Sequence, residues 1–174
     1  MNKALFLDRD GVINVEKDYL YKIDDFEFID GIFELCEYYI SRGYLIFVVT
    51  NQSGIARGFY TENDFNTLTS WMIKEFLKHN IKIQKVYFCP HHPDITGQCE
   101  CRKPNPKMLF DAMNEFDIDM SNSIIIGDKQ RDIDAGLNAG LNETYLFDES
   151  NQIVNSSATK IVNKLEDIYN VNIK

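Results

Sequence analysis

Residues 6–14, Phe-Leu-Asp-Arg-Asp-Gly-Val-Ile-Asn, decide the fold that this sequence predicts. The apolar run 4–7 that leads into them has the length and composition of a short buried strand. Asp8 follows where that strand should end, Asp10 comes two residues later, and Gly11 permits a tight bend. Two carboxylates this close repel each other unless a cation or a shared proton holds them together. A hard cation that prefers oxygen ligands, such as Mg²⁺, is the expected partner, although an acidic turn is the alternative for this motif alone.

Short apolar runs alternate along the rest of the chain with segments of helical periodicity. Thr61 has the character of a helix N-cap, and Gly43 and Gly140 follow helices as stop signals. Segment 16–30 shows neither period and is expected to form a loop or a small hairpin. The alternation predicts an α/β fold, a Rossmann-like three-layer sandwich with a central parallel sheet. The expected strands are 4–7, 44–49, 86–88, 123–126 and 144–147, with one more short strand and a closing helix within 159–169.

The size and charge of the chain exclude several classes of protein. Its 174 residues suit a single domain spanning 1–174. A net charge of −9 argues against a nucleic-acid or anionic-membrane binder, which needs a basic face. No apolar run approaches the roughly 18 residues of a membrane span. Because Asp8 and Arg9 interrupt the first apolar stretch, a signal peptide is not expected, and we predict a cytoplasmic protein.

Three of the predicted strands end in polar residues. Asp8 and Asp10 follow the first, segment 50–54 (Thr-Asn-Gln-Ser-Gly) the second, and Asp128 a later one. Because parallel strands bring their carboxyl ends to one edge of the sheet, we expect these groups to form one site. Hydroxyl and amide donors in segment 50–54 suit anionic oxygens, and Lys103 can neutralise phosphate charge. Each feature alone also fits a turn, a cap or a solvated surface, so their order along the chain is the signal.

A second cluster of metal-binding residue types lies in segment 89–101. Cys89, His91, Cys99 and Cys101 supply three thiols and an imidazole within thirteen residues. Four nitrogen and sulfur ligands suit a closed tetrahedral Zn²⁺ site, whose role is structural because no position remains for substrate. A redox pair or ordinary loop cysteines are the alternatives, and His92 is the competing imidazole.

These motifs resemble a known superfamily. The order Asp-x-Asp-Gly, strand-Thr-Asn, Lys and Gly-Asp-x-x-x-Asp resembles the haloacid dehalogenase (HAD) phosphohydrolases. The strings FLDRDGVIN, IDDFEFIDG, VVTNQSGIARG, CPHHPD, CECRKP and GDKQRD are similar to the family of D-glycero-D-manno-heptose-1,7-bisphosphate 7-phosphatases, whose nearest relatives are histidinol phosphatases. The match runs from about residue 5 to about residue 146. No insertion large enough for a cap domain is present, so the resemblance implies a capless enzyme with a zinc-stapled loop. Specificity is then expected in loops 16–22, 54–59 and 90–103.

The resemblance also implies a mechanism for the residues at the strand ends. Asp8 would attack phosphorus and form an aspartyl-phosphate, and Asp10 would act as general acid and then general base. Thr50 and Lys103 would stabilise charge on the transferred group. Magnesium would be held by Asp8, by Asp10 through its backbone carbonyl, and by Asp128.

Further roles carry over from the same family residue by residue. Arg102 would engage the distal phosphate of a sugar bisphosphate, where its fork of donors suits phosphate. Lys129 would touch the transferred phosphate, and the zinc ligands match Cys89, His91, Cys99 and Cys101. The remaining implied substrate contacts are Asp18, Tyr19, Asn51, Gln52 and Ser53.

The function predicted from the sequence is a Mg²⁺-dependent phosphohydrolase that removes the 7-phosphate of D-glycero-D-manno-heptose 1,7-bisphosphate, in heptose supply for lipopolysaccharide or another surface glycan. Its expected partner is this small phosphorylated sugar, with no nucleic acid and no membrane, and the expected state is a monomer. The alternatives are a histidinol-phosphate phosphatase, a polynucleotide end phosphatase, which the acidic charge disfavours, and a zinc-stapled non-catalytic interaction module.

Overall fold

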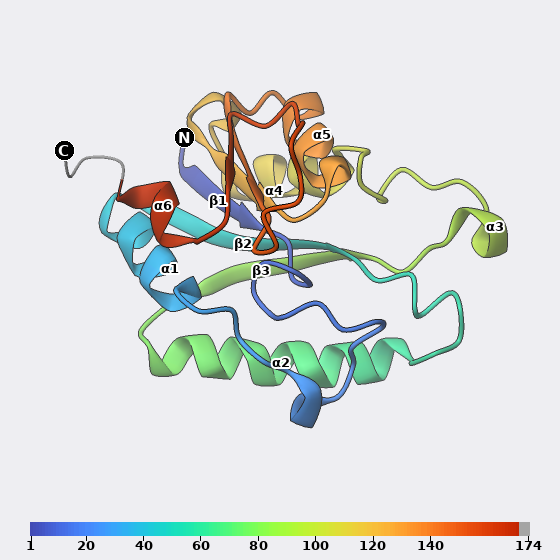
Figure 1. Cartoon of the computed structure of the whole chain (residues 1–174). Helices are drawn as coiled ribbons and strands as arrows, with labels where there is room; N and C mark the ends of the chain where they lie inside the picture. Colours follow the sequence, from blue (N-terminus) through green and yellow to red (C-terminus); the bar gives the residue numbers. More distant parts are fainter. Residues whose placement is uncertain (171–174) are drawn as a thin grey trace.

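The computed structural model describes residues 1–170, which form one six-stranded sheet with helices on both faces (Figure 1). Every pair of neighbouring strands is parallel, and the strand order is β3-β2-β1-β4-β5-β6. The predicted α/β class and parallel sheet are therefore confirmed. The strands are β1 (Lys3–Leu7), β2 (Tyr44–Asn51), β3 (Ile83–Cys89), β4 (Ile124–Gly127), β5 (Glu143–Phe147) and β6 (Lys160–Val162).

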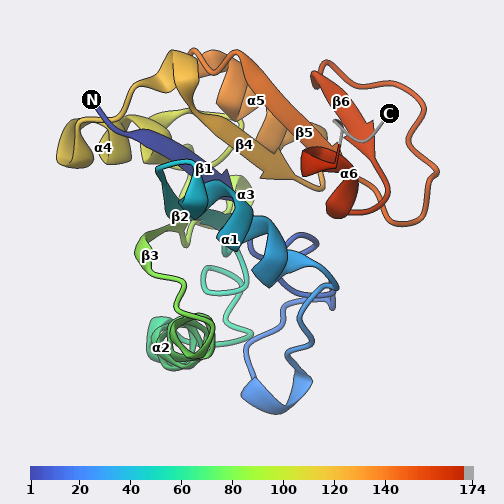
Figure 2. The ribbon, with the colours of Figure 1, turned by 90° about the vertical axis from the view of Figure 1, so that its left-hand side faces the viewer.

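The helices form two layers because successive side chains of a buried strand point to opposite faces of the sheet. Leu5 and Leu7 of β1 belong to the core shared with α1, α2 and α6, whereas Ala4 and Phe6 belong to the core shared with α4 and α5. Figure 2 shows these helices on either side of the sheet. The helices are α1 (Ile32–Ser41), α2 (Glu62–Lys78), α3 (Pro93–Thr96), α4 (Lys107–Phe116), α5 (Gln130–Asn138) and α6 (Glu166–Tyr169), with 3₁₀ turns η1 (Ile23–Asp25) and η2 (Met120–Asn122).

Local sequence signals set the helix ends. The Thr61 side chain accepts a hydrogen bond from the Asp64 backbone N–H at 3.1 Å, and the Asp64 carboxylate accepts one from the Thr61 N–H at 2.8 Å. This reciprocal capping box begins α2 where the sequence predicted a helix start. At the tail, β6 and α6 confirm the short strand and closing helix expected within 159–169.

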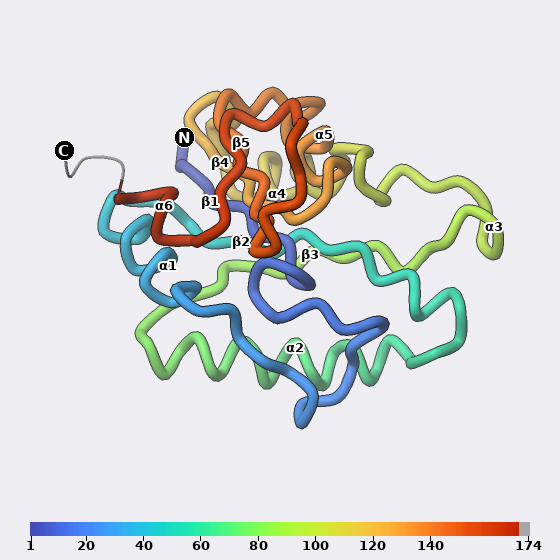
Figure 3. The backbone as a smooth tube through the Cα atoms, in the orientation of Figure 1, coloured from blue at the N-terminus to red at the C-terminus, as the bar shows by residue number. Residues whose placement is uncertain are grey.

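The strand order places a topological switch point at the centre of the sheet. The chain runs from β1 outwards to β2 and β3. It then returns through helix α4 and places β4 on the other side of β1. Ligands bind at such a crevice, beyond the carboxyl ends of the strands. The polar residues that follow β1, β2 and β4 therefore meet at one edge. In Figure 3 the connections after β2 and β3 leave the same end of the sheet, and the two are joined by the Gln52 N–H, which donates to Cys89 O at 2.7 Å.

Two details differ from the sequence prediction or sharpen it. Strand β3 begins at Ile83 rather than at residue 86. Ile83 is buried and pairs with Ile46 of β2, but the register shifts before the exposed Lys85, so the apolar pattern is interrupted ahead of residue 86. Segment 16–30 forms a loop with a hairpin-like base, where Val15 N–H donates to Glu27 O and Ile29 N–H to Ile13 O. Within residues 1–170, no helix combines the length and apolar character that crossing a membrane requires.

Candidate active site

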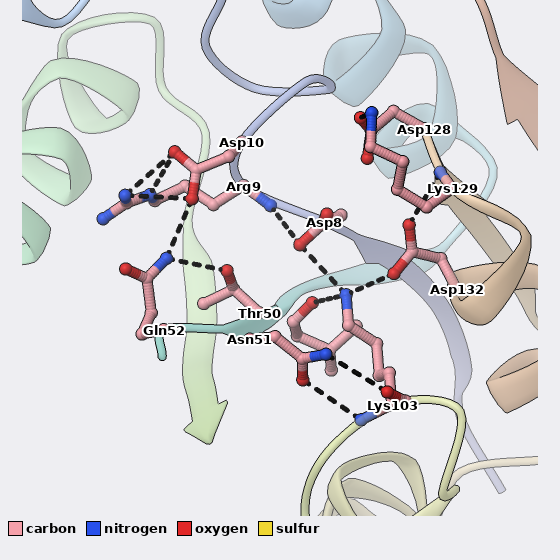
Figure 4. A network of polar contacts seen from close by, with 11 residues as sticks. Asp8, Arg9, Asp10, Thr50, Asn51, Gln52, Lys103, Asp128, Lys129 and Asp132 are labelled. Atoms are coloured by element: carbon pink, nitrogen blue, oxygen red, sulfur yellow. Dashed lines mark hydrogen bonds and ion pairs between the residues drawn. The ribbon is translucent and has the colours of Figure 1, made fainter. Parts of the chain in front are cut away.

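Lys103 joins two buried carboxylates at the centre of the strand edge (Figure 4). Its Nζ atom lies 3.0 Å from Asp8 Oδ1 and 2.8 Å from Asp132 Oδ1, and it donates to the Val49 carbonyl at 2.7 Å. Burial raises the pKa of Asp8 to about 8, although the Lys103 ammonium opposes this shift. The same two carboxylates raise the pKa of Lys103 against the effect of its own burial, so the lysine stays charged. A single cation thus neutralises part of a buried acidic cluster.

Asp128 brings a third carboxylate to this cluster. One oxygen each of Asp8, Asp128 and Asp132 lies within 4.8 Å of the other two. Among the described residues, Asp128 Oδ1 is a buried oxygen without a hydrogen-bond partner, while Oδ2 lies 2.7 Å from Lys129 Nζ. A buried acceptor beside other carboxylates is costly unless a cation binds it, so the site fits a hard divalent cation. Gly11 makes room for Asp128, because a Cβ atom at Gly11 would lie 2.4 Å from Asp128 Oδ2.

The Asp10 carboxylate points away from this cluster and toward Arg9 (Figure 4). Its Oδ1 accepts from Arg9 Nη2 at 2.9 Å and from Asn14 Nδ2 at 3.1 Å, and its Oδ2 accepts from Gln52 Nε2 at 2.9 Å. The Arg9 guanidinium is 1% exposed and also donates to the Leu20 carbonyl. The Asp10 side chain is therefore held near the nucleophile candidate Asp8 but outside the group of metal-competent carboxylates, which is Asp8, Asp128 and Asp132.

Segment 50–54 is held by side-chain hydrogen bonds. Thr50 is buried, and its Oγ1 accepts from Gln52 Nε2 at 2.9 Å. Asn51 pairs with the backbone of Lys103, accepting from its N–H at 3.0 Å and donating to its carbonyl at 3.2 Å. Asn51 therefore fixes the position of Lys103 across a gap of more than fifty residues in the chain.

A cavity of about 370 Å³ opens beside these residues. Its lining contains every residue that the sequence predicted as a substrate contact. It also contains groups of both signs, so an anionic substrate would meet cations here in spite of the acidic net charge. The predicted residues in the lining are Asp8, Asp10, Asp18, Tyr19, Asn51, Gln52, Ser53, Arg102 and Lys129, and the others include Glu16, Arg57, Tyr60, His92 and Arg131.

Glu16, Arg57 and His92 fall in the predicted specificity loops 16–22, 54–59 and 90–103, whereas the sequence assigned no role to Tyr60, Arg131 or Arg9. Arg57 Nη2 lies 2.8 Å from His92 Nε2, which joins the loop after β2 to the loop after β3. Arg9 lies between the two aspartates of the first motif, and the sequence analysis assigned it no place in the site. Its apolar neighbours come from distant segments, such as the Phe65 ring 5.7 Å from Arg9 Cζ, so no local signal marks it as buried. Tyr60 lies next to the Thr61 cap, and nothing in the local pattern indicates its direction.

The structure brings together three of the four predicted zinc ligands. The Sγ–Sγ distances are 3.6 Å for Cys89–Cys99, 3.7 Å for Cys99–Cys101 and 2.8 Å for Cys89–Cys101. Tetrahedral Zn–S bonds of about 2.3 Å place sulfur atoms about 3.8 Å apart, which the first two distances approach. His91 is not part of this group of atoms. His92, the competing imidazole, has one ring nitrogen next to Arg57 and the other accepting from the Asp94 N–H.

Comparison with known proteins identifies the family of this chain. A D-glycero-alpha-D-manno-heptose-1,7-bisphosphate 7-phosphatase from Campylobacter jejuni is 60% identical over 147 residues, which is 84% of this chain and 83% of that protein. The corresponding beta enzyme from Yersinia pestis is 42% identical over 95% of this chain and 92% of its own length. The chain belongs to the heptose-1,7-bisphosphate 7-phosphatase family.

Two further comparisons place this heptose bisphosphate phosphatase family member among HAD hydrolases. A D,D-heptose 1,7-bisphosphate phosphatase from B. bronchiseptica, crystallised with magnesium and phosphate, superimposes with a TM-score of 0.83 at 28% identity, covering 95% of both chains. The family model described as HAD-hydrolase-like matches residues 100–147. That segment contains Lys103, Asp128 and Asp132, so the matched region supplies the lysine and two of the clustered acids. The chain is a phosphoric monoester hydrolase of the HAD type.

Proposed function

We propose that this chain removes the 7-phosphate of D-glycero-D-manno-heptose 1,7-bisphosphate, as its relatives are named to do, and so supplies heptose for a surface glycan. The observation that carries the proposal is the buried cluster of Asp8, Asp128 and Asp132 around Lys103, next to a cavity lined by further cations. A cluster of carboxylates with one lysine, in which the buried Asp128 Oδ1 has no partner, suits a metal-assisted phosphoryl transfer. The arginine and lysine side chains that line the cavity suit a substrate with a second phosphate.

In the proposed reaction Asp8 is the nucleophile. Its carboxylate oxygen bonds to phosphorus while the bond from phosphorus to the sugar oxygen breaks, and Asp10 delivers a proton to that oxygen. Asp10 then takes a proton from water, which attacks phosphorus and releases Asp8. Thr50 and Lys103 would stabilise the charge of the transferred group, and the 3.0 Å contact of Lys103 Nζ with Asp8 Oδ1 supports a role for Lys103 in holding the nucleophile.

The donor set fits the two metals that we propose. Asp8, Asp128 and the backbone of Asp10 would hold Mg²⁺. When bound, this ion favours the ionised form of Asp8 and neutralises phosphate charge. Cys89, Cys99 and Cys101, with His91 as the fourth ligand, would hold Zn²⁺ in a structural site. A zinc-ordered loop ends at Arg102 and Lys103, so it fixes the distal phosphate contact and the central lysine together.

The finer assignments follow from the same family. The 60% identity to an enzyme named for the alpha anomer supports the alpha bisphosphate as substrate. Loops 16–22, 54–59 and 90–103 line the cavity without a cap domain, which supports a single phosphatase domain over residues 1–174. We propose that this domain acts as a monomer in the cytoplasm.

The test is Mg²⁺-dependent phosphate release from purified protein, with the alpha bisphosphate, the beta bisphosphate and histidinol phosphate as substrates. We expect the alpha bisphosphate to give the highest kcat/KM and chelation of Mg²⁺ to stop the reaction. Asp8→Asn should fold normally by circular dichroism and release no phosphate. A preference for histidinol phosphate would overturn the substrate assignment while leaving the nucleophile assignment standing.

A further inference from the structure

A buried chain of hydrogen bonds connects Tyr60 to two residues of the active site. The Tyr60 hydroxyl donates to Gln52 Oε1 at 2.5 Å. Gln52 Nε2 in turn donates to Asp10 Oδ2 and to Thr50 Oγ1, both at 2.9 Å. Gln52 is 2% exposed and Tyr60 is 6% exposed. The amide of Gln52 therefore lies between the proposed acid–base carboxylate and the proposed phosphoryl contact.

The direction of the Gln52 amide is determined by its neighbours. A carboxylate only accepts hydrogen bonds, so the NH₂ group must face Asp10 and the amide oxygen must face Tyr60. The reverse orientation would place the amide oxygen against Asp10 Oδ2, acceptor against acceptor. In the observed orientation the amide makes three hydrogen bonds within the protein. Gln52 lines the cavity, but its side-chain polar atoms are engaged by the protein rather than free for substrate.

Tyr60 is itself held firmly in place. Its ring stacks on Tyr21 with the centroids 5.5 Å apart and the planes 16° from parallel. It also passes close to the backbone at Gly54, where a Cβ atom would lie 2.2 Å from Tyr60 Cε1. Burial raises the pKa of the Tyr60 hydroxyl to about 12, so the hydroxyl stays protonated at neutral pH. The residue that faces Gln52 is thus rigid, protonated and dependent on a glycine.

Arg9 completes the arrangement from the opposite side. Arg9 Nη2 lies 2.9 Å from Asp10 Oδ1 and 3.0 Å from Oδ2, and Gln52 Nε2 is the further donor on Oδ2. Donors on both oxygens give the ionised Asp10 carboxylate one orientation, and proton transfer to a leaving oxygen requires that this orientation is kept when Asp10 carries the proton. Arg9 and Gln52 both donate to Asp10 Oδ2, and Gln52 is the uncharged donor. The orientation of the Gln52 amide depends on its hydrogen bond with Tyr60.

We propose that Tyr60, acting through Gln52, is a positioning residue for the acid–base carboxylate of Asp10. Tyr60 touches neither substrate nor metal in this account. It fixes the Gln52 amide, and the amide fixes Asp10 Oδ2 relative to Thr50. This inference rests on the proposed phosphatase mechanism, in which Asp10 protonates the leaving oxygen.

The test compares leaving groups. An alcohol leaving a sugar phosphate needs a proton, whereas 4-nitrophenolate leaves without one, so a misplaced general acid slows only the first reaction. General acid catalysis contributes about 10²–10⁴-fold, and we expect Tyr60→Phe to lower kcat/KM for the sugar bisphosphate by about tenfold. For 4-nitrophenyl phosphate we expect kcat/KM within about twofold of the parent protein. Because kcat/KM covers only the steps up to departure of the leaving group, hydrolysis of the aspartyl-phosphate does not enter the comparison.

Tyr87→Phe is the matched control. It also removes a phenol hydroxyl with a hydrogen bond, to Glu115 Oε2 at 2.9 Å, on strand β3 outside the cavity lining. It should leave both reactions unchanged. If Tyr60→Phe does not fold, Gln52→Met, which keeps the length of the side chain without its donors, replaces it; the expected result is then a larger loss of kcat/KM for the sugar bisphosphate than for 4-nitrophenyl phosphate.

Equal losses on both substrates would overturn the inference, because Tyr60 would then support the nucleophile or the fold rather than Asp10. No loss on either substrate would overturn it as well. The proposed function fails separately, if the unsubstituted protein releases no phosphate from the bisphosphate or if Asp8→Asn remains active.

Discussion

Lys103 Nζ lies 3.0 Å from Asp8 Oδ1, and both side chains are buried. The contact joins residues ninety-five positions apart, one at the end of β1 and one in the loop that follows the cysteine cluster. It links the proposed nucleophile to the proposed zinc loop. The loop must therefore be ordered if the Lys103 ammonium is to neutralise the Asp8 carboxylate.

Replacing Lys103 with Met should abolish phosphate release and destabilise the fold. The substitution leaves Asp8 and Asp132 buried without their shared cation, and breaking a buried ion pair in this way costs about 3–5 kcal/mol of unfolding free energy. Urea unfolding and phosphate release measure the two effects. Lys103→Arg is the control, since it keeps the charge but not the fit; it should recover more stability than activity. A Lys103→Met protein as stable as the parent would contradict the charge balance described here.

Gly11→Ala should weaken Mg²⁺ binding strongly. The backbone at Gly11 has φ of +88°, and the added Cβ would lie 2.4 Å from Asp128 Oδ2, so the carboxylate must move. Gly43→Ala is the matched control, because Gly43 has φ of +79° and no described atom within 4 Å of a new Cβ. Both variants carry the same backbone strain, and only Gly11→Ala displaces Asp128. Calorimetric titration with Mg²⁺ that gave equal losses for the two would show that strain alone is responsible.

Purified protein should contain about one Zn²⁺ per chain, as four protein ligands hold one ion. Cys99→Ser should lose the metal, lower the melting temperature and lower kcat/KM, because the loop places Arg102 and Lys103. His91→Ala should also lower zinc occupancy, whereas His92→Ala should not, since the His92 ring contacts Arg57 and the Asp94 N–H. Metal analysis and phosphate release decide the point. Zinc-free protein that is folded and fully active would refute the structural role.

Acid should destabilise the loop after β5 through Asp148. The Ser150 hydroxyl and the N–H groups of Ile153, Gln152 and Ser150 hold the pKa of Asp148 below its usual range. A lowered folded-state pKa means that the stabilisation is complete above the unfolded value of about 3.9 and disappears as the pH falls through the folded value. Asp148→Asn should therefore be less stable than the parent at pH 7, and the difference should narrow below about pH 4. Thermal unfolding across this range measures it; a difference that does not change with pH would be the contrary result.

The sequence predicted the sheet well because its strands are short apolar runs with clear ends. The predicted strand 144–147 and the observed β5 (Glu143–Phe147) differ by one residue. The location of the site could also be predicted from these strands, since parallel strands bring the residues that follow them to one edge of the sheet. Strand order was not predicted; it depends on the α4 crossover and on contacts such as the 3.0 Å hydrogen bond from Asp8 N–H to Ile126 O.

Side-chain direction was beyond the sequence. Gln52 was expected to contact substrate, but its amide is engaged by Asp10, Thr50 and Tyr60. Arg9 received no role from the sequence, yet it is buried and lies 5.7 Å from the ring of Phe65, which belongs to a distant segment. The positions of Gln52 and Arg9 depend on neighbours from distant segments, which the periodicity of the local sequence does not indicate. The sequence therefore identified which residues lie at the active-site edge of the sheet, but not the hydrogen bonds among them.

The most direct test of the account is Mg²⁺-dependent phosphate release from the alpha heptose 1,7-bisphosphate by the parent protein and by Asp8→Asn. The parent protein should turn over the alpha bisphosphate with kcat/KM about a hundredfold above that for histidinol phosphate, a difference of about 2.7 kcal/mol. Asp8→Asn should show no turnover and should remain folded. Phosphate release by folded Asp8→Asn at the parent rate would contradict the assignment of Asp8 as the nucleophile.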